Sequence, residues 1–193
     1  MLKKELRKRY LEKRKTLSAD EVNFLSEKIL EKFIVHFNVS ENQKIHIFLP
    51  ISKLNEINTL LFINYFWEKG VQVFIPKVIE GHIISINYTP ETILVENSWG
   101  IKEPIPSENV TSFFNFVITP LLYCDESGNR IGYGKGFYDD FFKKINGDAK
   151  KIGVNFFSPI EFIDDVSDQD VKLDYLITPD EILSFSETSI FTK

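Results

Sequence analysis

Six short, mostly apolar runs constrain the fold of this chain more than any other feature. Each is four to six residues long, which suits a buried strand and is too short for a helix; they span residues 45–49, 71–75, 83–86, 116–119, 151–156 and 175–178. Segments with helical spacing separate several of these runs. Strands that alternate with helices predict a single three-layer α/β/α domain over residues 1–193, with a mostly parallel, Rossmann-like central sheet.

The predicted helices cover residues 3–15, 19–37, 56–69 and a segment that begins near residue 137. The second helix has the clearest start, because Ser18 and Glu21 form a capping box. The segment 88–110 has no periodicity and is expected to be irregular. Within it, Trp99 is either a wall for a stacked ring or a packing residue. The run at 175–178 is the last predicted strand.

The glycine-rich stretch at residues 128–140 is Gly-Asn-Arg-Ile-Gly-Tyr-Gly-Lys-Gly-Phe-Tyr-Asp-Asp. It belongs to roughly seventeen residues without periodicity between a strand and a helix, which is long for a loop and indicates binding. Its glycines permit positive φ and close approach of a ligand to the backbone. Arg130 and Lys135 add positive charge, and so do the amides of a helix start. The stretch is therefore either a phosphate-binding loop or a glycine-rich turn with solvated charges.

Two familiar phosphate-binding motifs do not fit this stretch. A P-loop needs Ser or Thr directly after its Lys, whereas Gly136 and Phe137 follow Lys135. The dinucleotide-binding pattern needs a third glycine at the position that Phe137 occupies. The loop therefore calls for another way of holding phosphate.

Charge is distributed unevenly along the chain. Residues 1–15 contain eight Lys or Arg and two Glu, a net charge of +6, so that the remainder carries −11 of the total of −5. The basic helix is a solvated helix on an acidic body, an anion-binding element or a nucleic-acid arm. The acidic remainder and the lack of interleaved exposed aromatic residues in the helix count against nucleic acid.

Several classes of protein are excluded or disfavoured by composition. The chain has no run of about eighteen apolar residues and no apolar leader, so we expect a cytoplasmic protein without a membrane span. Its single cysteine, Cys124, excludes an internal disulfide and has no His nearby in sequence, which favours a buried inert thiol. Three histidines lie scattered without metal-ligand spacing and are expected to be structural.

Carboxylates complete the set of candidate residues. Glu56 is expected at a helix start beyond a strand, where it either favours the helix dipole or addresses a ligand. Asp139 and Asp170 offer hard oxygen ligands to a divalent cation. Together with the basic residues they indicate a nucleotide-dependent enzyme that acts on a small molecule.

The glycine-rich stretch, which ends in aromatic-Tyr-Asp, resembles the signature of the 5-formyltetrahydrofolate cyclo-ligase (5,10-methenyltetrahydrofolate synthetase) family. Weaker pieces occur in the family's order over nearly the whole chain: Lys3-Lys4-Glu5-Leu6-Arg7, Leu49-Pro50 with Glu56-Ile57 and Thr59, Ile75-Pro76-Lys77, Gly100 with Glu103-Pro104, Ile152-Gly153-Val154, Asp170 with Leu173-Asp174, and Ile177-Thr178. The resemblance implies a monomeric ligase of folate and one-carbon metabolism that binds neither nucleic acid nor membranes.

The implied reaction is the ATP- and Mg²⁺-dependent cyclisation of 5-formyltetrahydrofolate to 5,10-methenyltetrahydrofolate, with release of ADP and phosphate. A formamide oxygen is a poor leaving group and N10 is a weak nucleophile. Phosphorylation of the formyl oxygen activates the carbon, N10 attacks it, and phosphate departs. Such a site needs positioning and charge neutralisation more than a protein nucleophile.

The resemblance also assigns residues. Lys3, Lys4 and Arg7 match the ATP-binding start of the family. Its nucleotide loop matches Arg130, Ile131, Gly132, Tyr133, Gly134, Lys135, Gly136, Phe137 and Tyr138. Within this loop, Arg130 and Lys135 are the catalytic candidates, because they would meet phosphate oxygens.

The remaining assignments concern metal and folate. Asp139 and Asp170 match the magnesium ligands, Ile51 and Glu56 match folate-contacting positions, and Tyr133 and Lys135 lie where loop and folate would meet. The chain has Gln169 where the family usually has His, and glutamine carries no titratable proton, so an acid–base role there is in doubt. Two rivals stay open: a sugar-phosphate isomerase of similar fold, which would not use ATP, and a nucleic-acid-binding protein.

Overall fold

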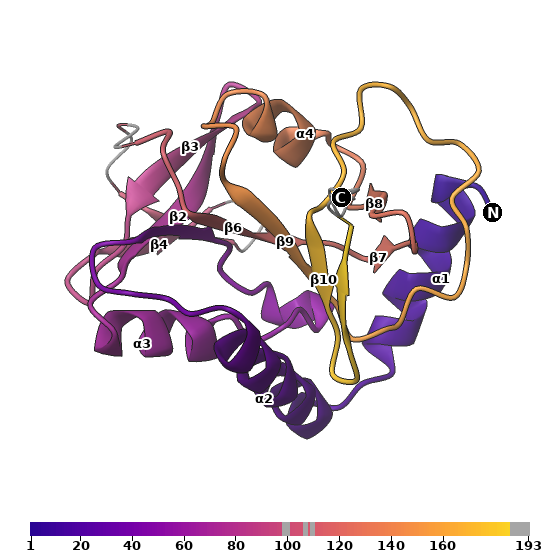
Figure 1. Cartoon of the computed structure of the whole chain (residues 1–193), viewed down its shortest axis with the longest axis horizontal. Coiled ribbons are helices and arrows are strands. Elements are labelled where there is room, and N and C mark those ends of the chain that lie inside the picture. The colour runs from indigo at the N-terminus through magenta and orange to yellow at the C-terminus, as the bar shows by residue number, and fades with distance from the viewer. Residues whose placement is uncertain (98–100, 106–107, 109–110, 186–193) are drawn as a thin grey trace, which may run out of the picture.

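The computed structural model describes residues 1–97, 101–105, 108 and 111–185. Trp99 and Gly100, which the sequence singled out, lie outside the described residues. Helices and strands alternate around one large sheet (Figure 1).

The central sheet has seven strands in the order β11-β10-β9-β6-β1-β2-β3. Their bounds are β1 (Lys44–Ile47), β2 (Gln72–Ile79), β3 (His82–Asn87), β6 (Phe116–Pro120), β9 (Lys150–Val154), β10 (Tyr175–Ile177) and β11 (Ile182–Ser184). The strands from β10 to β2 pair in parallel, whereas β3 and β11 close the two edges antiparallel. The predicted α/β class with a mostly parallel sheet is confirmed.

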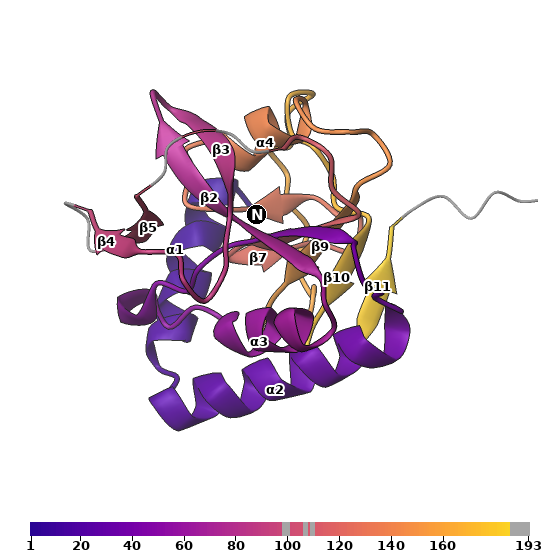
Figure 2. The same ribbon diagram turned by 90° about the vertical axis from the view of Figure 1, so that its left-hand side faces the viewer.

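Helices cover both faces of this sheet. Figure 2 shows α2 (Ala19–His36) and α3 (Leu60–Glu68) together beneath it and α4 (Phe137–Phe142) on the opposite side. The capping box predicted for α2 is present, since the Ser18 side chain accepts from the Glu21 amide and the Glu21 carboxylate accepts from the Ser18 amide. The helix α1 (Lys3–Lys15) matches its predicted bounds and packs beside the sheet.

Successive side chains of the strands point to opposite faces of the sheet and pack into two hydrophobic cores. In β6, Phe116 and Ile118 face α2 and α3, whereas Val117 faces α4. In β1, His46 points toward α4, where its ring meets Phe114 and Phe141 and its Nδ1 bonds the Ser85 hydroxyl at 3.0 Å. Burial lowers the pKa of His46 to about 3, so it is a neutral core residue, as the sequence indicated.

Several predicted boundaries are wrong. The strand predicted over residues 71–75 continues through Pro76 to Ile79. Beyond Phe74 it no longer pairs with β1 and pairs only with β3, where a proline is tolerated. The strand at 175–178 is not the last, since β11 follows it. The segment 88–110 contains β4 (Leu94–Glu96) and β5 (Lys102–Pro104), which form a separate antiparallel pair.

The long loop before α4 also contains a hairpin. Its strands β7 (Tyr123–Cys124) and β8 (Arg130–Ile131) pair antiparallel around a turn that includes Gly128. Both strands pack against α1, and Figure 1 shows the three elements gathered at one side of the molecule. The hairpin carries the glycine-rich stretch away from the sheet and toward the basic helix.

The strand order contains a topological switch point. From β1 the chain passes through α3 to β2 on one side, whereas β6 lies on the other side of β1. In open α/β sheets such a point leaves a crevice outside the carboxyl ends of the strands, and ligands bind there. The residues that follow β1 and β6 are therefore where a site is expected.

Candidate active site

An apolar cavity of about 600 Å³ lies at this crevice. Its walls come from the carboxyl ends of β1, β2 and β6 and from the glycine-rich loop; they include Phe48, Leu49, Ile51, Leu54, Pro76, Val78, Ile83, Pro120, Phe137 and Tyr138. Lys102 and Glu103 of β5 also line it. The Lys77 ammonium holds that segment to β2 by donating to the Pro104 carbonyl at 2.8 Å.

Glu56 is the buried carboxylate of the apolar cavity, and only 4% of its surface is exposed. Its Oε2 accepts from the Ile51 amide at 2.8 Å, and its Oε1 accepts from the Tyr133 hydroxyl at 2.6 Å. Burial raises the pKa of Glu56, and the Tyr133 hydrogen bond, the Arg14 charge and the Ile51 amide oppose that rise without cancelling it. The carboxylate is thus held in a fixed orientation by three segments.

The expectation that Glu56 begins a helix is wrong. The single turn η1 (Ser52–Leu54) ends at Asn55, whose φ of 47° is left-handed, and α3 starts only at Leu60. Thr59 accounts for the late start, because its hydroxyl donates to the Phe48 carbonyl at 2.6 Å and ties the loop to the end of β1. Glu56 therefore lies in a loop within the crevice, and its carboxylate is not stabilised by the dipole of a helix.

A basic cavity of about 350 Å³ adjoins the first. It is formed by the glycine-rich loop, the start of α1 and the loop after β9, with the residues Lys3, Arg7, Pro120, Arg130, Ile131, Gly132, Tyr133, Gly134, Lys135, Gly136, Phe137, Tyr138, Asp139 and Asp170. Five residues line both cavities: Pro120, Tyr133, Lys135, Phe137 and Tyr138. The two cavities therefore share one wall.

Arg7 fastens the glycine-rich loop to α1. Its Nε donates to the Gly132 carbonyl at 2.9 Å. Gly134 has a φ of 90°, and a Cβ there would lie 3.3 Å from the Arg7 guanidinium. A side chain at Gly134 would be strained and would crowd Arg7, so the glycine allows the close approach of helix and loop.

The charges of the basic cavity are paired with one another. The Arg130 guanidinium contacts Asp139 Oδ1 at 2.7 Å and also donates to the Val171 carbonyl. The Lys3 ammonium bonds Asp170 Oδ2. Burial would raise the pKa of Asp170, but hydrogen bonds from Lys3 and from the Ser167 amide, together with the Lys3 and Arg130 charges, place it below its ordinary value.

Lys135 differs from these paired cations. It is exposed at the shared wall and makes no hydrogen bond or ion pair with the residues that the structure describes. The Tyr138 hydroxyl, on the same wall, is buried and has no hydrogen-bond partner among those residues. Lys135 is thus an unpaired cation where the cavities meet, and the neighbouring Tyr138 has a buried hydroxyl without a partner among the described residues.

The donor set suits a magnesium ion that arrives with phosphate. Asp139 and Asp170 both line the basic cavity, and within the described ranges no group of three or more His, Cys, Asp and Glu surrounds a common point. Magnesium is commonly held by one or two carboxylates, with water and substrate phosphates as its other ligands. The residues present fit that pattern.

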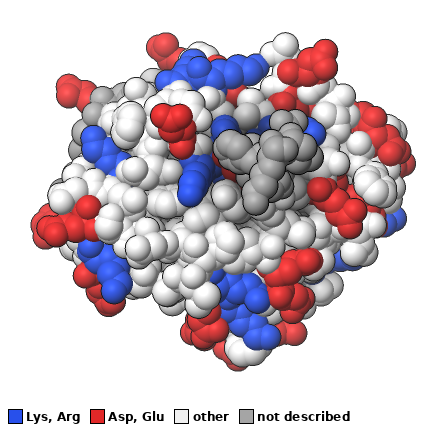
Figure 3. Space-filling view, in the orientation of Figure 1, with Lys and Arg blue, Asp and Glu red and all other residues white. Residues whose placement is uncertain are grey.

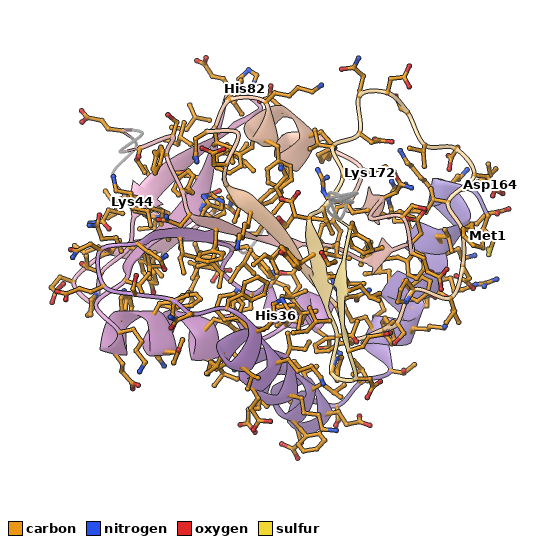
Figure 4. All side chains as sticks on the ribbon, in the orientation of Figure 1. Met1, His36, Lys44, His82, Asp164 and Lys172 are labelled. Atoms are coloured by element: carbon orange, nitrogen blue, oxygen red, sulfur yellow. The ribbon has the colours of Figure 1, made fainter. Side chains whose placement is uncertain are left out.

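Every site residue expected from sequence lines a cavity except one. Lys4 is exposed and lies in neither wall. Gln169 also lies outside both walls, and its amide oxygen accepts from the Lys143 ammonium at 2.7 Å. Figure 4 shows His36 on α2 and His82 near α4, on different sides of the molecule, so the histidines do not gather at the site.

Sequence reasoning missed Arg14. Its guanidinium is buried and donates to the Leu54 carbonyl at 2.8 Å, to the Leu121 carbonyl at 3.3 Å and to the Tyr133 hydroxyl. A signal was present, because Leu6, Tyr10 and Arg14 are spaced by four residues on α1. An arginine that continues an apolar stripe points inward with its partners, and here it points toward Glu56.

A sequence model of the 5-formyltetrahydrofolate cyclo-ligase family matches residues 1–179 of the chain. The 5-formyltetrahydrofolate cyclo-ligase of Mus musculus is 30% identical over 152 residues, which are 74% of this chain and 74% of that protein. The solved 5,10-methenyltetrahydrofolate synthetase of Aquifex aeolicus superposes with a TM-score of 0.77 at 27% identity, covering 97% of this chain and 94% of the other.

The corresponding synthetase of Mycoplasma pneumoniae gives a TM-score of 0.72, also at 27% identity, over 93% of this chain and 99% of that chain. The family match covers the glycine-rich loop, both cavities and nearly the whole sheet. The resemblance seen in the sequence is confirmed: the chain belongs to the 5-formyltetrahydrofolate cyclo-ligase family.

Proposed function

We propose that this protein converts 5-formyltetrahydrofolate to 5,10-methenyltetrahydrofolate with consumption of magnesium–ATP and release of ADP and phosphate. The observation that carries the proposal is the shared wall between an apolar cavity and a basic cavity. A folate ring in the first and a triphosphate in the second would meet at Tyr133 and Lys135. Family membership supplies the substrate class.

The apolar cavity has the size and chemistry for the folate ring system. Ligand cavities of about 300–1,000 Å³ hold small molecules, and most are apolar with a few placed polar groups. Glu56 accepts hydrogen bonds, so it suits the N–H donors of a pterin.

The basic cavity suits the nucleotide. ATP supplies the phosphoryl group that makes the formyl oxygen a leaving group. Lys135 lies where that group would pass from one cavity to the other, so we assign it the neutralisation of the transferred charge. Lys3, Arg7 and Arg130 would neutralise the remaining phosphates, and Asp139 and Asp170 would hold the metal.

No protein nucleophile is needed for this chemistry. The thiol of Cys124 is buried, its pKa is raised by that burial, and it donates to the Asp125 carbonyl at 3.3 Å. Phosphoryl transfer depends on positioning and electrostatics, which the two cavities offer. A monomeric state and a cytoplasmic location belong to the same proposal.

One assay tests the proposal against its rivals. Purified protein is incubated with 5-formyltetrahydrofolate, with and without magnesium–ATP, and the near-ultraviolet absorbance of the methenyl product is followed. Product is expected only when all components are present, with one ADP per product. Absence of product, or its formation without ATP, would contradict the proposal.

Among the described residues, no helix is long and apolar enough to cross a membrane. Figure 3 shows positive and negative side chains interspersed on one face of the molecule.

A further inference from the structure

Arg14 lies at the centre of the site without lining either cavity. Among the residues that the structure describes, it is the only Lys or Arg that is buried over the whole residue, with 4% of its surface exposed. Its partners come from the turn η1, from the segment after β6 and from the glycine-rich loop. A buried cation is costly unless it is paired and hydrogen-bonded, so this placement requires all of these partners.

The direction of the hydrogen bonds follows from chemistry. Arginine is a donor only, so the Tyr133 hydroxyl accepts from Arg14 and must aim its own proton elsewhere. That proton goes to Glu56 Oε1, 2.6 Å away. The Arg14 guanidinium itself is 3.9 Å from the same oxygen. The hydrogen bonds from Arg14 to Tyr133 and from Tyr133 to Glu56 are therefore donated in one direction, from the helix through the loop to the carboxylate.

These two hydrogen bonds fix the wall between the cavities. Tyr133 is 38% exposed and lines both cavities, yet its hydroxyl is held by two charged groups. Charge-assisted hydrogen bonds are short and strong, so the ring is held in place even though it borders open space. A lysine at position 14 would supply the charge but not the planar fork that reaches three acceptors.

We infer that Arg14 is a positioning residue, which holds the Tyr133 hydroxyl on the Glu56 carboxylate and thereby sets folate affinity without touching folate. The inference rests on the proposed function, because it assumes that the apolar cavity takes the folate. Under the same proposal, the nucleotide is bound by Lys3, Arg7, Arg130 and Lys135, none of which hydrogen-bonds to Arg14, so we expect nucleotide affinity to change much less than folate affinity.

The test compares Arg14→Met with Arg9→Met, a matched change on the same helix. Arg9 pairs with Glu161 and lines neither cavity. Dissociation constants are measured by calorimetry for 5-formyltetrahydrofolate alone and for magnesium–ATP alone. Arg14→Met should weaken folate binding about tenfold, as expected for a lost hydrogen bond to a charged group, and change ATP binding less than about twofold. Arg9→Met should leave both unchanged.

Two further variants separate positioning from folding. Tyr133→Phe removes the bridging hydroxyl and leaves the buried arginine in place, so it serves if Arg14→Met does not fold. It should weaken folate binding by a similar factor, and Arg14→Met should add little in that background. Arg14→Lys should recover only part of the affinity. Unchanged folate binding in Tyr133→Phe, or full recovery in Arg14→Lys, would overturn the inference.

The pH profile gives a readout that a structural role would not move. The titratable groups near Glu56 are Arg14 of α1, Tyr133 of the loop and Tyr138 of α4. The charged residues Lys53, Lys102, Glu103 and Lys135 line the same cavity. Burial already raises its pKa, and loss of the Arg14 charge would raise it further. The affinity lost in Arg14→Met should therefore be greatest at low pH and recover as pH rises, with no such trend in Arg9→Met. A loss that is equal at all pH values would contradict this role.

If the unaltered protein does not bind 5-formyltetrahydrofolate, the proposed function fails and the inference fails with it. If the unaltered protein binds folate and Arg14→Met binds it equally well, only the inference fails. The two results are distinguishable in one set of titrations.

Discussion

The two cavities that share Tyr133 and Lys135 hold their polar groups in opposite ways. In the apolar cavity, Glu56 is buried and its hydrogen bonds come from groups fixed by the fold. In the basic cavity, Lys3 pairs with Asp170 and Arg130 with Asp139, and three of these four side chains remain about one fifth or more exposed. One cavity is organised around a single acceptor, the other around ion pairs.

The difference shows what each cavity must do to receive its ligand. No ion pair of the apolar cavity must be broken when a ligand binds. Affinity there should therefore depend on shape, burial and the Glu56 acceptor, which is already in place. In the basic cavity, each proposed metal carboxylate now neutralises a proposed phosphate-binding cation. If the proposal holds, phosphate and metal that bind together would satisfy both kinds of group, whereas either alone would leave one kind unpaired.

Removal of magnesium should give the largest difference between the two cavities, because it should abolish turnover and leave folate binding almost unchanged. We expect an excess of EDTA to reduce turnover below detection, because the metal would be needed to balance phosphate against Asp139 and Asp170. Binding of 5-formyltetrahydrofolate, measured by calorimetry in the same buffer, should change less than about twofold, since no carboxylate of the metal pair lines the apolar cavity. Full turnover in EDTA would remove both metal assignments.

Lys135→Ala tests the shared wall. We expect kcat to fall about 100-fold to 1,000-fold, the usual loss when a preorganised group that stabilises transition-state charge is removed. The matched control is Lys143→Ala, an exposed lysine that bonds Gln169 and lines neither cavity. Circular dichroism should show both variants folded. Normal kcat in Lys135→Ala would exclude the phosphate role of this residue.

Glu56→Gln probes the apolar cavity alone. The amide keeps the shape but replaces one acceptor by a donor, so the Tyr133 and Ile51 donors cannot both be satisfied. We expect KM for 5-formyltetrahydrofolate to rise about tenfold to 100-fold while KM for ATP stays within about twofold. The exposed Glu126 is the control, as Glu126→Gln. Equal effects on both substrates would refute a contact restricted to the folate.

The smallest expected effect is that of Asp170→Asn on stability. The Lys3–Asp170 pair is partly exposed, so its loss should lower the free energy of unfolding by no more than about 1 kcal/mol at pH 7. The pKa of Asp170 lies below 3.8 in the folded protein, so the stabilisation is present above that pH and is lost as pH falls through the folded pKa.

Urea unfolding at several pH values measures this difference. The gap between Asp170→Asn and the unaltered protein should be largest near neutral pH and should close in acid. A gap that widened as pH fell would contradict the proposed origin of the pKa shift.

Local signals predicted most of the scaffold. The capping box at Ser18 placed the start of α2, and the apolar runs located six strands of the sheet. The errors arise where partners far along the chain decide the structure. The strand β2 passes through Pro76 because β3 pairs with it, and α3 starts late because Thr59 bonds the end of β1. The hairpins β4–β5 and β7–β8 have strands of two or three residues, too short for any period to appear.

The candidate site was predicted as a set of residues but not as an arrangement. The resemblance named every residue that lines the basic cavity except Pro120 as a site residue, and it named Ile51 and Glu56 in the apolar cavity. It did not name other wall residues of the apolar cavity, such as Val78 and Ile83. It could not separate the charges that are free, as Lys135 is, from those already paired, as Arg130 is. Arg14 was counted only as surface charge, because its partners Leu54, Leu121 and Tyr133 become neighbours only in the folded chain.

The attachment of α1 has a consequence for how the protein is made. Lys3 meets Asp170 across 167 residues of chain, and Arg7 meets Gly132 across 125. Figure 4 labels Met1 beside Asp164, and their ion pair of 2.7 Å joins the same two regions. The ribosome synthesises the N-terminus first, so α1 cannot make these contacts until most of the chain has been synthesised. The strands β1, β2 and β3 are synthesised long before the last residues that line the basic cavity, so this cavity is among the last parts of the molecule to form.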